Sequence, residues 1–244
     1  MNTNRQTAIK ESNMKPTASN LIRWAGLAAI GAGVIFVVIQ PIHPLDVLSS
    51  VTTTRWAVVH YLSLVMDLLG LLGIAGIYAR QAEKSGWLGL AGYLLFGLFW
   101  ALDVAFHFIE AFVEPAMATE APKFVAGLLG MVNGVPSEMS LGAIPAVYAL
   151  DGIAGYVLGG LLFGIATFRA GILPRWAGGL LALGTMLPLL LSSLVQHPYD
   201  RIFAVPVGLA IAWLGYALWS ERREPAAQPL PGSTKPQLRP TGAE

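Results

Sequence analysis

The sequence predicts an all-α fold, a polytopic membrane bundle of six transmembrane helices with both termini in the cytoplasm. Of the 244 residues, 55% are hydrophobic and only 12% are charged, whereas soluble domains carry about 25% charged residues. Six apolar runs of roughly 20 residues follow one another, and each is long enough to cross a bilayer. Lysine and arginine gather in alternate connections, as the positive-inside rule requires of a multi-pass protein.

The predicted spans divide the chain into a cytoplasmic N-terminal segment (1–20), a transmembrane domain (21–220) and a cytoplasmic tail (221–244). No small-residue cleavage site follows the first apolar run, so we expect a retained helix and not a cleaved signal. The proline-rich tail has few apolar residues and is expected to be disordered. The six spans are roughly Leu21–Gln40, Trp56–Tyr78, Trp87–Val113, Ile144–Phe168, Trp176–Val195 and Ile202–Ser220.

The basic residues predict the orientation. Three of the fifteen lie on one side of the predicted membrane, namely Arg55, Lys123 and Arg201. The other twelve lie on the opposite side, which is therefore predicted to be cytoplasmic: Arg5, Lys10, Lys15, Arg23, Arg80, Lys84, Arg169, Arg175, Arg222, Arg223, Lys235 and Arg239. Five tryptophans at predicted span ends are typical of interfacial belts: Trp24, Trp87, Trp176 and Trp219 inside, and Trp56 outside.

The predicted connections differ in length. The inner connections Ala79–Gly86 and Arg169–Arg175 are short, whereas the outer segments Pro41–Arg55 and Glu114–Ala143 are longer. Within the last segment the apolar stretch Phe124–Val132 predicts a short interfacial or re-entrant helix.

A weak internal repeat predicts helix hairpins. Arg-Trp-Ala-Gly opens both span one, at Arg23, and span five, at Arg175, and a His-Pro-x-Asp tetrapeptide follows each span, at His43 and at His197. Both spans run from inside to outside, so the match is typical of a parallel repeat. A chance match of so short a pattern is the alternative.

The third span carries ionisable residues in an otherwise apolar stretch. Asp103, His107, Glu110 and Glu114 are spaced i, i+4, i+7 and i+11, which places them within about 60° of one another on one helix face. Ionisable groups in a membrane are costly and normally face a protein interior or a wet cavity. We therefore expect a functional site, and the alternative is polar pairing that only holds helices together.

Two neighbouring spans offer partners for this stripe. His60 and Asp67 share one face of span two with Ser63, and Asp151 lies one turn from Tyr148 in span four. If these residues face the third span, they complete a pocket that binds a proton, a cation or a small amphiphilic molecule. Pairing within a helix, His60 with Asp67 or His107 with Asp103, is the structural alternative.

Metal binding is a further interpretation of the same residues. Imidazoles and carboxylates together suit a borderline divalent ion such as zinc, iron or manganese. The candidate ligands are His60, His107, Asp103 and Glu110. These residues fit a site that holds a divalent metal ion and equally a site without one.

All four histidines map to the less basic side, which favours a site that opens outward. In the outer loops the candidates are His43, Asp46, His197 and Asp200, acting in a lid or in ligand binding. The alternative is structural: the aspartates would cap nearby helices, and each His-Pro pair would end the preceding helix.

Two classes of function are excluded by composition. The chain has no cysteine, which rules out a disulfide framework, a thiol nucleophile and a thiolate metal site. It also has no basic domain with interleaved aromatic residues, so no nucleic-acid partner is expected. The expected partners are the lipid bilayer and a small ligand.

Three boundary motifs resemble those of a group of bacterial multi-pass membrane proteins to which no activity is assigned: Gly76-Ile77-Tyr78-Ala79-Arg80, Gly86-Trp87-Leu88-Gly89-Leu90 and Gly171-Ile172-Leu173-Pro174-Arg175-Trp176. The resemblance implies a bacterial plasma membrane. Zinc-dependent intramembrane hydrolases of the ceramidase type share only the clustering of His and Asp within helices. The last span here has no His, which argues against that family.

Three functions remain open. The leading prediction is a binding or transport protein with an outward-facing acidic and histidine pocket. One alternative is an enzyme that uses a metal ion or acid–base groups on a lipid-like substrate. The other is a structural or assembly protein whose polar residues only join helices.

Overall fold

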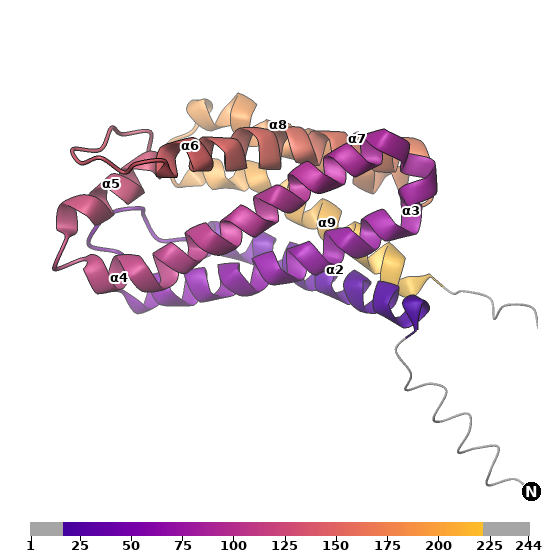
Figure 1. Ribbon diagram of the computed structural model, residues 1–244, viewed down its shortest axis with the longest axis horizontal. Helices are drawn as coiled ribbons and strands as arrows, with labels where there is room; N and C mark the ends of the chain where they lie inside the picture. Colours follow the sequence, from indigo (N-terminus) through magenta and orange to yellow (C-terminus); the bar gives the residue numbers. More distant parts are fainter. Residues whose placement is uncertain (1–16, 222–244) are drawn as a thin grey trace, which may run out of the picture.

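The computed structural model describes residues 17–221, and within that range every regular element is a helix (Figure 1). The all-α prediction is confirmed. Residues 1–16 and 222–244, with most of the predicted N-terminal segment and the predicted tail, lie outside the described residues.

The elements follow one another as helices, and the longest connections between them are residues 43–53 and 133–143. They are α2 (Ala18–Ile42), α3 (Thr54–Phe108), the π-helix η1 (Ile109–Val113), α4 (Glu114–Met117), α5 (Pro122–Val132), α6 (Ile144–Ala149), the π-helix η2 (Leu150–Gly159), α7 (Gly160–Ala170), α8 (Arg175–Leu191), the 3-10 helices η3 (Ser192–Leu194) and η4 (Tyr199–Ala204), and α9 (Val205–Ser220). The short helix predicted in the long outer segment is present as α5.

Five helices in the described range are long and apolar enough to cross a membrane: Asn20–Ile42, Thr54–Met117, Ile144–Ala170, Arg175–Leu194 and Tyr199–Ser220. Such helices indicate a membrane protein. The second contains two of the predicted spans, so all six predicted apolar runs are helical.

The helix α3 is two helices that meet at Gly86. We call residues 54–85 the first arm and residues 87–108 the second arm, and Figure 1 shows the second arm running back along the first. Gly86 has φ +56° and ψ −151°, a conformation that is open to glycine and strained for other residues. The predicted loop Ala79–Gly86 is therefore wrong, because its strong helix formers continue the first arm and a single glycine reverses the chain.

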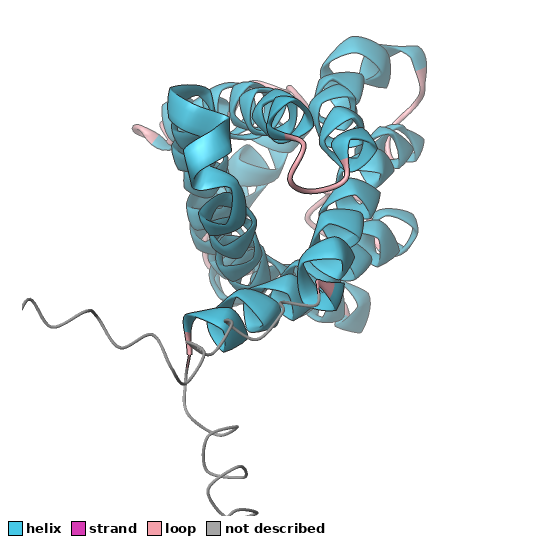
Figure 2. Ribbon diagram, turned by 90° about the vertical axis from the view of Figure 1, so that its right-hand side faces the viewer, coloured by secondary structure: helices cyan, strands magenta, loops and turns pink. Residues whose placement is uncertain are grey.

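The described chain has two distinct ends. At one end, the terminus end, lie the start of α2, the Gly86 kink, the turn between α7 and α8, and the end of α9 (Figure 1). The opposite end, the loop end, holds the connection from α2 to α3 with α4, α5 and the segment 133–143. Figure 2 looks onto the terminus end and shows the long helices gathered side by side around a common axis.

Aromatic side chains fill the centre of the bundle. Trp100 is fully buried. Its ring packs edge to face with the rings of Phe36 and Phe96, at 6.2 Å and 5.9 Å between centroids. These residues come from α2 and from the second arm, which lie far apart in the sequence. The core therefore joins the first helix to the arm that carries the predicted ionisable stripe.

Side-chain exposure agrees only in part with the predicted tryptophan belt. Trp24, Trp87 and Trp176 have between 68% and 86% of their surface exposed, whereas Trp56 has none. Trp56 instead donates its indole N–H to the backbone carbonyl of Glu110 at 2.7 Å. The prediction that Trp56 lies at a lipid interface is wrong, because this residue is packed inside the loop end.

Glycines let α7 approach α8 closely. A Cβ atom added at Gly164 would lie 2.6 Å from the carbonyl oxygen of Gly178 and 2.5 Å from the backbone nitrogen of Ala182. At Gly97, in the second arm, the nearest atom would be Ile74 Cδ1 at 3.7 Å, an ordinary contact. The two glycines thus differ in packing although both lie in helices.

This difference predicts opposite effects of the same substitution. Gly164→Ala is expected to lower the free energy of unfolding by about 1–3 kcal/mol, because the backbone of α8 must move away. Gly97→Ala, the matched control, should be neutral or stabilise by up to about 1 kcal/mol through helix propensity. Thermal unfolding of the two purified variants in detergent measures this, and equal melting temperatures would contradict the close packing.

Candidate functional site

The polar stripe of the second arm faces the protein interior at the loop end. Asp103 and His107 line a cavity of about 370 Å³, together with Asp151 of η2. The end of α2 and the segment from η3 to η4 complete its walls through Gln40, His43, Ser192, His197, Asp200 and Arg201. The structure thus brings together spans two, three and four, as the stripes predict.

Short contacts join the two arms of α3. His107 Nδ1 donates a hydrogen bond to Asp67 Oδ2 at 2.7 Å, and Asp67 is fully buried. His60 Nε2 lies 3.4 Å from Glu110 Oε2, in ion-pair range but without hydrogen-bond geometry. His107 therefore has its short carboxylate contact on the first arm, and His60 has its own on η1, which continues the second arm. Among the described residues no hydrogen bond or ion pair joins His60 to Asp67 or His107 to Asp103, so the predicted pairing within one helix is wrong for both.

One group has the spacing of metal ligands. A ligand atom from each of Asp67, Asp103 and His107 lies within 4.8 Å of the others. Two carboxylate oxygens and one imidazole nitrogen suit a divalent ion of borderline softness. His60 and Glu110, which the sequence suggested as further ligands, form a separate pair on the other side of His107, where Glu110 Oε2 lies 3.9 Å from His107 Nε2.

Several buried polar atoms around the cavity have no hydrogen-bond partner in the described part of the chain. Asp151 Oδ1 and the hydroxyl of Tyr156 belong to residues that line the cavity, and Asp67 Oδ1 and Glu114 Oε2 belong to other buried acids. A buried polar group without a partner costs roughly 1–3 kcal/mol, more when it is charged. Buried acceptors of this kind are available to a bound ligand.

Two π-helices carry residues of the site. Glu110 lies in η1, and Asp151 and Tyr156 lie in η2. The π-helix is rare and frequently found at functional sites, because its wider turn displaces side chains and backbone groups from the α-helical pattern. Nothing in the residue spacing reveals these segments.

The two His-Pro-x-Asp loops meet at the loop end. His197 faces Asp46 through Nε2 and Asp200 through Nδ1, both at 3.1 Å. Arg201 also donates to Asp46 Oδ2, at 2.8 Å. We call these four residues the mouth cluster. The helix-capping alternative is wrong for both aspartates, since α9 starts after Ala204 without a side-chain cap and Asp46 accepts bonds from Arg201 and His197.

His43 ends α2, as its place before Pro44 predicts. Its Nδ1 donates to the Pro44 carbonyl at 2.7 Å, and burial, aided by the charge of Arg201, lowers the pKa of His43 to about 2. The imidazole is therefore neutral at physiological pH. Its ring lies 5.2 Å from that of His60, which lies 6.2 Å from that of His107, so three of the four histidines form a row.

Sequence reasoning missed several residues that shape the site. Arg201 counted only as an outer charge, although it directly follows a His-Pro-x-Asp tetrapeptide, which is a usable signal. Tyr156 and Phe99 face the cavity from spans otherwise rich in apolar residues, and no local pattern distinguishes them. Glu114 and Asp67 were expected, and both are buried.

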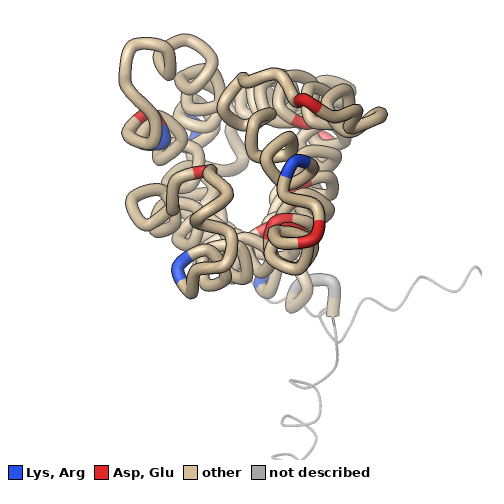
Figure 3. Tube along the Cα trace, turned by 90° about the vertical axis from the view of Figure 1, so that its left-hand side faces the viewer, with Lys and Arg blue, Asp and Glu red and all other residues tan. Residues whose placement is uncertain are grey.

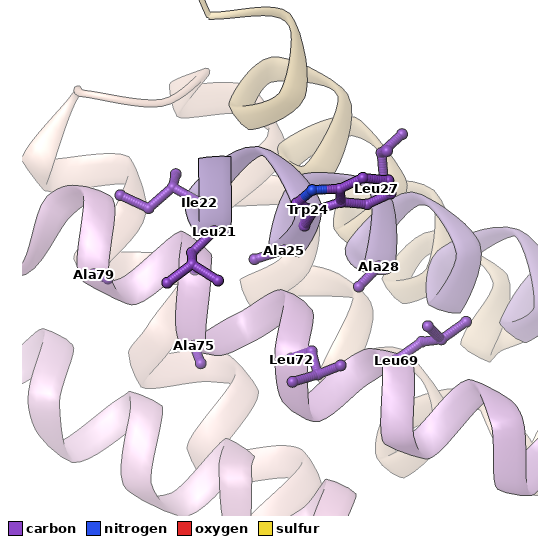
Figure 4. Close-up of a pocket in the computed structure, with 11 residues that line it drawn as sticks. Leu21, Ile22, Trp24, Ala25, Leu27, Ala28, Leu69, Leu72, Ala75 and Ala79 are labelled. Atoms are coloured by element: carbon purple, nitrogen blue, oxygen red, sulfur yellow. The ribbon is translucent and has the colours of Figure 1, made fainter. Parts of the chain in front are cut away.

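A second, wider groove has a different character. It has a volume of about 670 Å³ and runs between α2 and the first arm towards the terminus end (Figure 4). Leucine, isoleucine, alanine and glycine line it together with Trp24, and its lining includes no ionisable side chain. The candidate chemistry therefore lies in the cavity of the loop end.

No protein-family model, curated protein or solved structure matches this chain.

Proposed function

We propose that this chain is a six-span protein of the bacterial plasma membrane that binds and transports a cation through a site that opens outward. Both termini would be cytoplasmic. The described basic residues support this orientation: Arg23, Arg80, Lys84, Arg169 and Arg175 lie towards the terminus end, and Arg55, Lys123 and Arg201 towards the loop end. Figure 3 looks onto the loop end, where acidic positions gather, and the positive-inside rule makes this the outer end.

The observation that supports a cation as the ligand is the imbalance of charge around the cavity. Three carboxylates line it, those of Asp103, Asp151 and Asp200, whereas the one Lys or Arg among the described lining residues is Arg201. That guanidinium already binds Asp46. Carboxylates buried in a low dielectric need a compensating positive charge, and a bound cation or a proton supplies it.

A second function, a metal-assisted reaction on a lipid-like substrate, is favoured by the ligand spacing of Asp67, Asp103 and His107. A divalent ion held there would polarise a carbonyl or activate a water molecule. The adjoining cavity has room for part of a substrate.

Uptake into proteoliposomes tests the leading proposal. Wild-type protein is expected to take up at least one of Mn²⁺, Na⁺ and methylammonium above protein-free vesicles, and Asp103→Asn should reduce that uptake at least about tenfold, because it removes a charge at the centre of the site. Glu83→Gln, an exposed change at the terminus end, is the matched control and should transport normally.

Metal analysis separates the alternatives. A tightly held transition metal that is lost in His107→Ala, without any uptake, would favour the enzyme. If Asp103→Asn and His107→Ala both leave uptake and metal content unchanged and only lower the melting temperature, the polar residues serve assembly and the proposal is wrong.

A further inference from the structure

The cavity is larger than an inorganic ion requires. A coordinated metal ion is enclosed by ligand atoms at about 2.0–2.6 Å, whereas the volume here is about 370 Å³. Pockets that bind small organic molecules range from about 300 to 1,000 Å³. Space for an organic group therefore adjoins Asp103 and Asp151.

Two carboxylates that line the cavity can accept hydrogen bonds from a positive group. Asp151 is only 4% exposed, and its Oδ1 has no partner among the described residues. Asp103, on the second arm, lines the same cavity. The N–H groups of an ammonium ion would donate to these carboxylates, and hydrogen bonds between charged groups are about twice as strong as neutral ones.

Apolar and aromatic side chains also line the cavity. Phe36, Met66, Phe99 and Tyr156 line it from α2, both arms of α3 and η2. The rings of Phe99 and Tyr156 pack edge to face at 5.1 Å between centroids. Aromatic rings attract cations within about 6 Å, and the same apolar side chains would bury a hydrocarbon arm.

From this juxtaposition we infer that the transported cation is an organic ammonium ion with a short apolar or aromatic arm. The inference rests on the proposed cation site and names its ligand class. Its ammonium group lies against Asp103 and Asp151, and its arm lies against Phe36, Phe99 and Tyr156. An anionic ligand is disfavoured, because the carboxylates of Asp103, Asp151 and Asp200 repel it and Arg201 already donates to Asp46 through Nη2.

Calorimetric titration of the purified full chain in detergent tests this inference. The probes are phenylbutylammonium and phenylbutanol, which share one arm and differ in charge, with binding to protein-free micelles subtracted. The ammonium probe is expected to bind at least about tenfold more tightly than the alcohol. Asp151→Asn should remove most of that preference while leaving alcohol binding unchanged, and the Glu83→Gln control should retain it.

The outcomes distinguish this inference from the function on which it rests. Equal affinity for the two probes in the wild-type protein would overturn it, and that comparison needs no variant to fold. Absent ammonium binding alongside Mn²⁺ uptake that depends on Asp103 would overturn the organic ligand but leave the cation site. Ammonium binding that survives Asp151→Asn unchanged would also overturn it, because the charge would then be recognised elsewhere.

Discussion

Replacing His107 with alanine is expected to lower the free energy of unfolding by about 3–5 kcal/mol, which is the cost of removing one partner from a buried ion pair. Asp67 has no exposed surface, and His107 Nδ1 provides its short contact at 2.7 Å. A lost hydrogen bond between membrane helices would cost only about 0.6–1.7 kcal/mol. The size of the loss therefore reports whether Asp67 is a paired charge or a merely hydrogen-bonded group. Thermal unfolding in detergent measures it.

Two further variants serve as controls for this result. Asp67→Asn removes the charge but keeps a polar group, and His107 retains two other carboxylates nearby, Glu110 at 3.9 Å and Asp103, so we expect a loss of only about 1 kcal/mol. The double variant Asp67→Asn with His107→Ala should be more stable than His107→Ala alone, since it no longer buries an unpartnered carboxylate. If the losses in unfolding free energy of the two single variants simply add in the double variant, Asp67 and His107 do not form an ion pair.

The second large effect is expected at the mouth cluster. Asp46→Ala should lower the free energy of unfolding by about 2 kcal/mol, because it leaves Arg201 and His197 without their shared carboxylate. This figure lies below that for His107 because the Arg201 and His197 side chains are 21% and 30% exposed. Thermal unfolding gives the total, and hydrogen exchange of residues 43–53 should show where the structure loosens.

An exposed ion pair at the same end provides the matched control. Lys123 and Glu138 lie 3.4 Å apart with more than 70% of each side chain exposed. Lys123→Gln should have no measurable effect, since exposed pairs contribute little. If Asp46→Ala behaves in the same way, the mouth cluster does not hold the two loops together.

Much of the fold could be predicted because the controlling interactions are local. Apolar runs such as Leu21–Gln40 predict helices, and the observed α2 extends this one by only a few residues at each end. The 100° spacing of Asp103 and His107 correctly predicts that both face one side. The internal duplication stays a prediction, although its two tetrapeptides do meet at Asp46 and His197.

Other features escaped prediction because they depend on packing between distant segments. Trp56 was expected at the membrane surface, yet it is buried because the carbonyl of Glu110, 54 residues away, accepts its indole N–H. The π-helix that carries Glu110 depends on backbone hydrogen bonding, which residue spacing does not encode. A single residue, Gly86, reverses the chain, and the strong helix formers before it stay helical. The predicted loop Ala79–Gly86 was therefore too long.

The sequence by itself determined that this protein is helical and apolar, and that its histidines and the carboxylates within its apolar spans lie towards one end, because composition and periodicity act along a single chain. Only the tertiary structure decided which of them meet. His107 lies against Asp67, 40 residues away, and His197 against Asp46, 151 residues away. Such pairs form because a charge withdrawn from water needs whatever partner the folded backbone brings within reach, and no local pattern specifies that partner.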